Sequence, residues 1–436
     1  MGLHVKPGAD WQSVYNRAIA LAPEAFDSER INNLVMGEWK RVGTPTHHVN
    51  PVDQTEMAGP PKVDHQTAVD AVDDALRQHK LWGTIALDER KTRVASALAG
   101  LRESRDTIAL LLAWEIGKPW KLACADVDRC IDGVEWYLTQ IDRQMEGRSQ
   151  LSGPISNIAS WNYPLSVLVH AELVQVLAGN AVIAKTPSQG GFHSLTLAHA
   201  MMARAGLPVT LLSGVGSELS DALVSSPHLG AFAFVGGRSN GRATLERLAD
   251  FDRRHILEQE GLNAWGIWDF SDWDNLAPHL RKGFEYAKQR CTAYPRYVVQ
   301  RPLFPQFLEM YLPILRGLRF GHPLAVENDT DELPDLEFGP VIHTTKALEL
   351  KAQFDEAITT GGIPLYQGDL AHGRFIAGQD TSAYVAPATV LEPPRAWSLH
   401  HSEPCGPIDS IVLVDTEAEF IAAMNVSNGN LVSSVA

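Results

Sequence analysis

Apolar residues follow two different patterns along the chain. Between residues 65 and 150 they recur every three or four positions, which predicts helices over 65–79 and 87–116. From residue 154 onward, short apolar runs alternate with amphipathic stretches. The runs predict strands at 155–160, 181–186, 209–214, 231–237 and 255–260, and the stretches between them predict helices at 163–178, 192–205, 217–225 and 239–249. Residues 1–60 are mixed, with one short strand expected at 34–35.

Strands that alternate with helices indicate right-handed βαβ units and a parallel sheet. A second α/β unit follows, with strands expected at 297–300, 339–342 and 410–414. Ligands of such sheets bind at the carboxyl ends of the strands. The polar and glycine residues at those ends are therefore candidates for a binding site: Ser160, Trp161, Asn162, Lys185, Ser188, Gly214, Gly216, Gly236, Gly237 and Glu258.

Composition and charge narrow the class of protein. The chain has 436 residues, 45% of them hydrophobic, which is enough for two or three packed units. A formal net charge of −15 disfavours nucleic acid as a partner. The sequence has no apolar run of about 18 residues, so we expect no membrane span, and its first residues do not resemble a signal peptide. Four cysteines give neither a disulfide framework nor zinc-ligand spacing, which favours a cytoplasmic location and no metal.

The stretch "FEYAKQRCTAYPRYVVQ" (284–300) contains the most ambiguous residue, Cys291. Its approach is predicted to be helical, with Phe284, Ala287 and Cys291 on one face. Taken alone, the residue is either a buried packing thiol, the commoner case, or a nucleophile. The other candidates also have simple structural explanations: a helix cap for Asn162, and a salt bridge for Glu258.

Six segments, in order along the chain, together resemble motifs of the aldehyde dehydrogenase superfamily. "SWNYPL" (160–165) is similar to P-W-N-[FY]-P, and "NAVIAKTPSQ" (180–189) to N-x-V-x-x-K-P. "FVGGRSNGR" (234–242) resembles F-T-G-S-x-x-x-G-R, and "LEQEGLN" (257–263) resembles L-E-L-G-G-K-[SN]. "QRC" (289–291) is similar to G-Q-x-C, and "SEPCGP" (402–407) to E-[EI]-[FP]-G-P.

This resemblance implies a role for each matching residue. Cys291 is expected to be the nucleophile, Glu258 the general base and Asn162 the amide that stabilises the oxyanion. Lys185 is expected at the adenosine ribose and Glu403 at the nicotinamide ribose. The rest of the cofactor site would be formed by Ser160, Trp161, Ser188, Gly214, Phe234, Gly236 and Gly237.

The resemblance also implies an activity and a domain plan. The expected reaction is oxidation of an aldehyde, as a small-molecule substrate, to a carboxylic acid with NADP or NAD, through a thioester that water hydrolyses. The expected fold is α/β. Residues 1–257 would hold N-terminal helices and a parallel-sheet nucleotide-binding domain, 258–424 an α/β catalytic domain, and 425–436 the start of a return segment that looks truncated.

Several positions depart from the family pattern. Glu260 replaces a glycine, Cys405 a phenylalanine, and Gly237 a serine or threonine. Ser188 stands where NAD-preferring members often have glutamate, so we expect NADP to be accepted. We expected Glu258 and Glu260 to share one face of a strand. A hairpin that usually precedes the first nucleotide strand is missing, which favours a homodimer.

Two other functions remain open from the sequence. A CoA-acylating dehydrogenase would use the same cysteine, but that class usually lacks the glutamate base. A catalytically silent binding protein would explain Glu260 and Cys405. The funnel that leads to Cys291 is expected to be lined near Trp114, Trp120, Tyr294 and the segment 395–401, which includes Trp397. These aromatic residues favour an aromatic or bulky apolar aldehyde as the substrate. His400 and His401, in the same segment, are expected in solvent.

Overall fold

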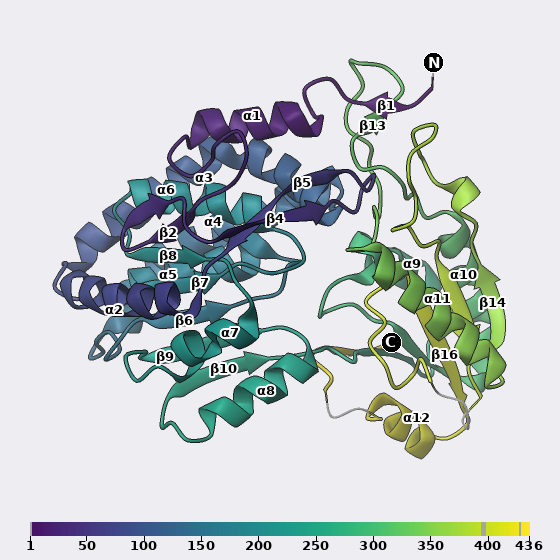
Figure 1. Ribbon diagram of the computed structural model, residues 1–436. Coiled ribbons are helices and arrows are strands. Elements are labelled where there is room, and N and C mark those ends of the chain that lie inside the picture. Colours follow the sequence, from purple (N-terminus) through teal and green to yellow (C-terminus); the bar gives the residue numbers. More distant parts are fainter. Residues whose placement is uncertain (1, 394–397, 427–428) are drawn as a thin grey trace.

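A computed structural model describes residues 2–393, 398–426 and 429–436. The chain forms two lobes, each built around its own β-sheet (Figure 1). The first lobe holds the N-terminal helices and a sheet of seven strands, and the second holds a sheet of six. The α/β class predicted from the sequence is confirmed.

Five neighbouring strands of the first sheet are parallel, in the order β10-β9-β6-β7-β8. Beyond β8 the sheet continues with β2, which is antiparallel to β8, and then with β3, which is antiparallel to β2. The parallel part begins with β6 in the middle of the sheet. The chain runs outward from β6 through β7 to β8, and then returns to β9 on the other side of β6. This reversal is a topological switch point, where a parallel sheet opens a crevice for a ligand. The strands are β2 Asn33–Val35, β3 Glu38–Lys40, β6 Ile155–Ile158, β7 Val182–Lys185, β8 Val209–Leu212, β9 Ala231–Val235 and β10 Arg254–Glu258.

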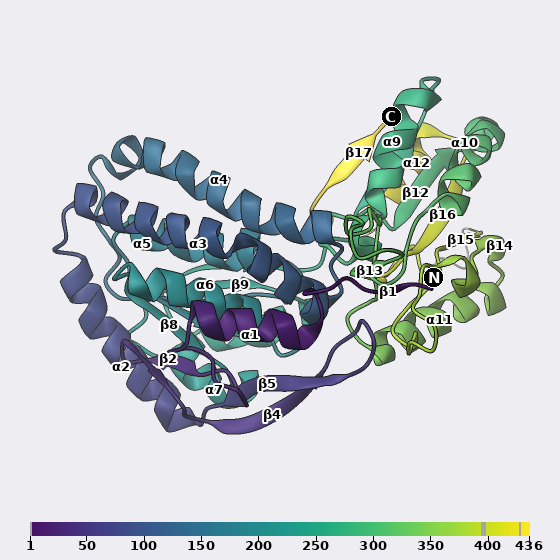
Figure 2. The ribbon, with the colours of Figure 1, turned by 90° about the horizontal axis from the view of Figure 1, so that it is seen from above.

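Helices cover both faces of this sheet (Figure 2). One face carries α3 Leu87–Ile116, α4 Trp120–Met145, the π-helical turn η1 Pro164–Val169, α5 His170–Leu177 and α6 Phe192–Arg204, with α1 Trp11–Leu21 packed on α3. The other carries α2 His65–Trp82, α7 Gly216–Ser220, η2 Asp221–Ser225 and α8 Arg238–Leu248. The predicted helix at 87–116 matches α3, and the one at 65–79 is three residues longer.

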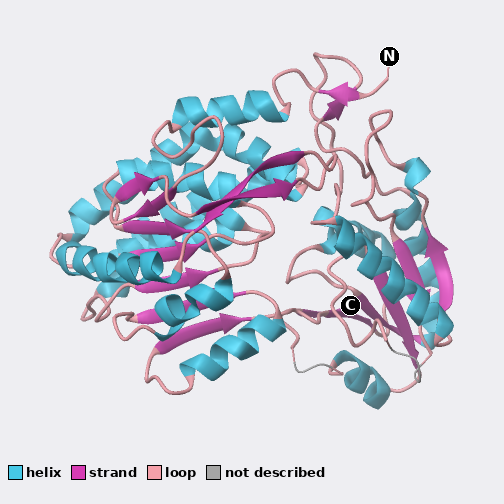
Figure 3. Ribbon diagram, viewed as in Figure 1, coloured by secondary structure: helices cyan, strands magenta, loops and turns pink. Residues whose placement is uncertain are grey.

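The second sheet has the order β14-β15-β16-β12-β11-β17, with β14 antiparallel to the rest. Its strands are β11 Ala264–Ile267, β12 Arg296–Gln300, β14 Ile363–Gln367, β15 Ala388–Leu391, β16 Ile408–Val414 and β17 Ser433–Val435. Its helices are α9 Trp273–Gly283, η3 Glu285–Lys288, η4 Arg301–Leu303, α10 Phe304–Arg316, α11 Thr344–Thr359, η5 Leu370–His372 and α12 Glu417–Met424 (Figure 3).

Two small antiparallel pairs lie outside the main sheets. Strand β1 (His4–Val5), from the beginning of the chain, pairs with β13 (Ala325–Val326) of the second lobe. The hairpin of β4 (Thr44–Val49) and β5 (Glu56–Lys62) was not predicted. The direct passage from α4 to β6 was predicted, because only residues 146–154 separate them.

The predicted helical approach to Cys291 is wrong. Helix α9 ends at Gly283, and the chain then places Tyr286, Ala287 and Lys288 in the left-handed region, with φ of 59°, 53° and 56°. Side chains rarely adopt this conformation, so these three residues end the helical path. Cys291 therefore lies in a turn after η3.

Two other expectations were also wrong. Residues 339–342 form no strand, because their backbone groups bond to the side chain of Gln289 and to Ala383. Glu260 lies beyond the end of β10, not on it. Within the expected return segment, residues 433–435 form β17, an edge strand of the second sheet.

Candidate active site

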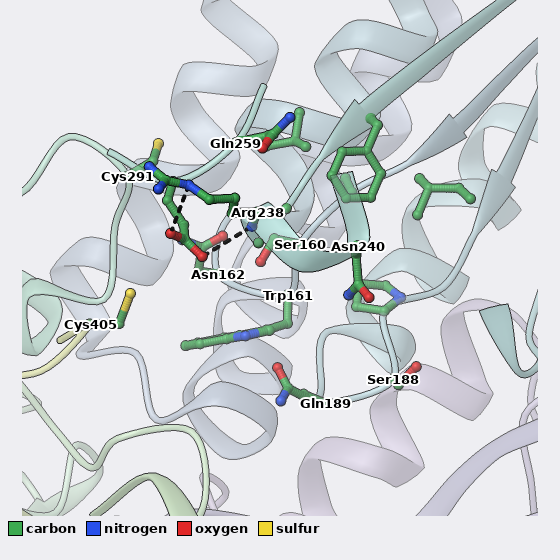
Figure 4. A pocket seen from close by; sticks show the side chains of 18 of the residues that line it. Ser160, Trp161, Asn162, Ser188, Gln189, Arg238, Asn240, Gln259, Cys291 and Cys405 are labelled. Atoms are coloured by element: carbon green, nitrogen blue, oxygen red, sulfur yellow. Dashed lines mark hydrogen bonds and ion pairs between the residues drawn. The ribbon is translucent and has the colours of Figure 1, made fainter. Parts of the chain in front are cut away.

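A cavity of about 1160 Å³ lies between the two lobes, at the carboxyl ends of the first sheet's strands. Its wall contains most of the sequence candidates, namely Ser160, Trp161, Asn162, Lys185, Ser188, Phe234, Gly236, Gly237, Cys291 and Glu403. Cys291 and Asn162 lie at one end of the cavity, and Ser188 lies toward the other (Figure 4). These ten residues thus line one continuous space.

Backbone packing and one buried amide hold the turn that carries Cys291. A Cβ added to Gly261 would lie 1.9 Å from the carbonyl oxygen of Cys291, so only glycine fits there. The fully buried Asn263 donates its side-chain amide to the carbonyls of Cys291 (2.6 Å) and Ala293 (2.7 Å). Its amide oxygen accepts backbone N–H groups from Leu431 and Val432. Asn263 therefore joins the turn to the segment that leads into β17.

Gln289 fixes the other side of the same turn. Its side-chain amide donates to the carbonyl of Pro340 at 3.2 Å, and its oxygen accepts the N–H of Ile342 at 2.9 Å. Sequence reasoning did not single out Gln289 or Asn263, although both lie within the quoted motifs. The hydrogen-bond partner Ile342 of Gln289 lies about 50 residues away along the chain, and the partner Ala293 of Asn263 lies about 30 residues away. Only the fold therefore shows that both side chains hold the turn of Cys291.

Glu258 is the carboxylate in contact with Cys291. The thiol Sγ lies 3.8 Å from Glu258 Oε1, in a partly buried position where the thiol donates to the carboxylate. Burial, with added repulsion from Glu258 and Glu403, raises the pKa of the Cys291 thiol to about 11. The thiol is therefore protonated at neutral pH, and Glu258 is the base within reach of its proton.

Asn162 is fixed close to the same turn. Its side-chain amide donates to the carbonyl of Gln289 at 3.0 Å. Its own carbonyl accepts the ammonium of Lys118 at 2.7 Å, and that ammonium also pairs with Asp126 at 2.9 Å. Lys118 and Asp126 are fully buried, and burial lowers the pKa of Lys118 despite the pairing. This buried pair holds the loop that positions Asn162.

The other end of the cavity has groups suited to a dinucleotide. Lys185 is buried and lines the wall, its ammonium donates to the carbonyl of Thr186 at 2.8 Å, and burial lowers its pKa to about 8. Ser188 is exposed at the wall, and the rings of Trp161 and Phe234 supply apolar surface. A buried cation, a hydroxyl and aromatic faces at a switch point fit the ribose, phosphate and base groups of NAD or NADP.

Acidic groups gather on the second lobe's side of the cavity. Burial first, and Glu260 second, raise the pKa of Glu403 to about 7, while Lys346 opposes the shift. Cys405 lies at a positive φ of 49° and burial raises the pKa of its thiol far above the usual range. The carboxyl of Glu260 accepts the backbone N–H of Arg238, at the start of α8, at 3.0 Å.

Some predicted residues lie elsewhere. Among the residues that the structure describes, the cavity wall includes neither Gly214 nor Glu258. Gly214 packs against Leu219, and its neighbours Val215 and Gly216 line the wall in its place. Glu258 lies behind the wall and reaches the site through its contact with Cys291.

The expected aromatic funnel does not match the cavity either. Within the described chain, Trp114, Trp120 and Tyr294 are absent from the wall, and Trp397 lies outside the described residues. Trp114 is buried and donates its indole N–H to Ala9, so it is a core residue. His401 is exposed and lines the cavity, as expected of a loop histidine, whereas His400 is buried, contrary to expectation. The inference of an aromatic substrate therefore loses its basis.

The structure thus places a thiol beside a carboxylate at a switch-point cavity, the position where parallel sheets bind dinucleotides. The model of the aldehyde dehydrogenase family matches residues 39–436, and the chain belongs to that family. It is an oxidoreductase of the aldehyde dehydrogenase type that uses NAD or NADP. Within the described residues, no helix is long and apolar enough to cross a membrane.

The chain is similar to several known proteins of this family. It is 26% identical to the 1-pyrroline-5-carboxylate dehydrogenase of Staphylococcus saprophyticus, over 94% of this chain and 80% of that protein. It is 22% identical to the succinate semialdehyde dehydrogenase of Acinetobacter baylyi, over 90% and 82%. The NADP-dependent glyceraldehyde-3-phosphate dehydrogenase of Bacillus halodurans, solved with NADP, superposes with a TM-score of 0.82 at 25% identity, over 94% and 86%.

Proposed function

We propose that Cys291 is the nucleophile and Glu258 the general base of an aldehyde dehydrogenase that hydrolyses its thioester. The observation that carries this proposal is the contact of 3.8 Å between Glu258 and the thiol of Cys291, which itself lines a cavity that suits a dinucleotide. The small-molecule substrate is an aldehyde.

Attack on the aldehyde forms a C–S bond and moves the carbonyl π electrons onto oxygen. Glu258 accepts the thiol proton, because only the thiolate is nucleophilic. The oxyanion is stabilised by the backbone N–H of Cys291 and by the side-chain amide of Asn162. That amide has two N–H groups, of which the Gln289 carbonyl uses one.

An oxidised nicotinamide, when bound, would supply the acceptor for the hydrogen and electron pair that leave the aldehyde carbon. A thioester then remains on Cys291. Glu258 first releases the thiol proton to solvent and is a carboxylate again. It then removes a proton from water as the water oxygen attacks the thioester and the C–S bond breaks, and it returns this proton to the leaving thiolate, so that a carboxylic acid leaves and the thiol is restored. The reacting carbon would lie between Cys291 and the cofactor end of the cavity wall.

The cofactor would be held by residues from both lobes. We propose Lys185 and Ser188 at the adenosine ribose and Glu403 at the nicotinamide ribose. Trp161 and Phe234 give apolar walls, and the start of α8, after Gly236 and Gly237, faces the phosphates. Ser160 completes the wall beside Trp161.

Single-turnover kinetics test the two catalytic roles. A panel of aldehydes is mixed with the enzyme and NAD or NADP, with and without CoA, and the reduced cofactor is followed. Glu258→Gln is expected to give a burst of about one equivalent per active site and then near-arrest, because the thioester persists. Loss of a general base slows its step by roughly 10²–10⁴-fold. Cys291→Ala is expected to abolish the burst.

Other outcomes would contradict the proposal. A burst that survives Cys291→Ala would make this cysteine a packing residue. A stalled thioester in Glu260→Gly, with normal turnover in Glu258→Gln, would show that Glu260 and not Glu258 is the general base. Turnover that requires CoA would indicate an acylating enzyme, and no reduction with any aldehyde would indicate a binding protein.

Cofactor preference follows from Ser188. A glutamate at this position would repel a 2′-phosphate, whereas the exposed serine hydroxyl can donate to it. We propose that NADP is used at least as well as NAD. The ratio of kcat/KM for the two cofactors measures this, and Ser188→Glu should shift the ratio toward NAD. An about hundredfold preference of the unaltered enzyme for NAD would exclude it.

We also propose an assembly and a location for the protein. The chain passes from Met145 to Ile155 without a hairpin that could pair with another subunit, which favours a homodimer. Light scattering that gave a stable tetramer would exclude this. All four cysteines are free, which fits a reducing cytoplasm, and cell fractionation tests that location.

A further inference from the structure

Glu260 places a carboxylate at the start of α8. Its Oε1 accepts the backbone N–H of Arg238 at 3.0 Å, and its Oε2 lies 3.7 Å from the Arg238 guanidinium. The dashed lines from Arg238 in Figure 4 mark interactions of this residue. The side chain of Glu260 is 35% exposed and lines the cavity, so it meets solvent in this position.

This position is the one that suits a phosphate group. Helix N-termini bind anions, since their first N–H groups have no partner within the helix and the dipole favours negative charge. Gly237 leaves the approach to α8 open, since a Cβ on it would find its nearest neighbour at 3.8 Å, on Glu260 Oε1 itself. Gly236, by contrast, packs against the ring of Phe234, which an added Cβ would meet at 2.8 Å. The carboxylate therefore occupies one of the donors that a diphosphate would use, the N–H of Arg238.

A second acid lies close enough to Glu260 to oppose its position at the start of α8. Glu403 carries a pKa of about 7, raised by burial and by Glu260, which means that the two acids repel one another. Lys346 offsets part of this charge, and Arg238 is the cation in contact with Glu260. A second anion added here would meet both acids, and its entry would require Glu260 to leave.

We propose that Glu260 is an internal competitor of the cofactor's diphosphate, so that its displacement from α8 limits the affinity for NAD and NADP. The inference rests on the dinucleotide cavity but not on the roles of Cys291 and Glu258. An alternative is that Glu260 only caps α8 and acts on stability. The two explanations differ in their effect on binding.

Isothermal titration without aldehyde separates them. The probes are NAD, ADP-ribose, which keeps the diphosphate, and adenosine, which has none. Glu260→Gln keeps an acceptor for Arg238 but removes the charge, and Glu260→Gly removes the whole side chain. Both are expected to lower the Kd of NAD and ADP-ribose at least about tenfold, while that of adenosine stays within about twofold.

Glu349→Gln is the matched control, because Glu349 also lines the cavity but pairs with Lys346 on α11. It is expected to change each Kd less than about twofold. An unchanged or higher Kd for ADP-ribose in both Glu260 variants would overturn the proposal. So would an equal gain with adenosine, because it would place the effect away from the diphosphate.

A structure of the unaltered protein with ADP-ribose gives a test that needs no variant. A diphosphate oxygen is expected within hydrogen-bond distance of the Arg238 N–H, with the Glu260 carboxylate moved away. A carboxylate that keeps this bond in the complex would overturn the proposal. Repeating the titrations in a Cys291→Ala background separates the outcomes, because the competition is expected to persist where turnover cannot occur.

Discussion

The charges around Cys291 explain why a carboxylate must accompany this thiol. Burial and the two acids Glu258 and Glu403 raise the pKa of the thiol to about 11. A cysteine at this pKa holds its proton at neutral pH and is a weak nucleophile until a base removes it. The same contact with Glu258 that raises the pKa supplies that base at 3.8 Å.

This balance predicts the reactivity of the thiol without cofactor. Alkylation of Cys291 by iodoacetamide should be slow near pH 7 and still be rising at about pH 10, because the thiolate form increases up to the raised pKa. Glu258→Gln removes a negative charge, so it should lower the pKa and speed alkylation at every pH below it. Mass spectrometry of the modified peptide gives the rate, and Cys291→Ala gives the background from the other cysteines. A midpoint at the ordinary value near 8.5 would contradict the prediction.

At the scale of elements, the sequence predicted the regular parts of the first sheet well. Strands β6 to β10 and the helices between them follow local apolar periodicity, which a sequence displays directly. The left-handed run at 286–288 could not be predicted, because distant contacts hold it. Tyr286 donates its hydroxyl to Ile116, and the buried ammonium of Lys288 pairs with Asp409. These partners are 170 and 121 residues away along the chain.

The candidate site was predictable only as far as its motifs reach. The six motifs, found in the family's order along the chain, identified most of the residues that line the cavity, because those residues lie within the motifs. The supporting groups Lys118 and Asn263 were missed, because their function depends on which backbone carbonyls the fold brings near. Glu260 was recognised as unusual, but its contact with Arg238 across to α8 depends on where β10 ends.

The close approach of Gly261 to the Cys291 turn predicts the effect of one methyl group. A Cβ at 1.9 Å from the Cys291 carbonyl forces the turn to move, and a displacement of about 1 Å near a nucleophile costs roughly 10²-fold in rate. Gly261→Ala should therefore reduce the burst rate by at least about that factor. Gly283→Ala is the control, because its added Cβ meets nothing within 4 Å at the end of α9. Equal burst rates in the two variants would contradict the prediction.

At the scale of the whole molecule, segments from the beginning of the chain join the two lobes. Strand β1 pairs with β13, and Lys6 bonds to the carbonyls of Leu324 and Asp331. Farther along, the carbonyl of Val52 accepts the side chains of Gln379 and Tyr384. Because the cavity wall has residues from both lobes, these contacts affect how the two halves of the site face one another.

Deleting residues 1–7 removes β1 and its pairing with the second lobe, while α1 and both main sheets stay intact. A few lost backbone hydrogen bonds, at about 1 kcal/mol each, should lower the free energy of unfolding by about 1–3 kcal/mol. The dinucleotide should bind more weakly, because the lobes must then be ordered on binding. Calorimetry gives the melting temperature and titration gives the Kd. Asp329→Asn is the control, since it removes only the exposed pair with His4, worth less than about 1 kcal/mol. A deletion variant that melts and binds NAD like the full chain would contradict the prediction. It would show that β1 is not needed, and that other contacts such as those of Val52 with Gln379 and Tyr384 hold the lobes together.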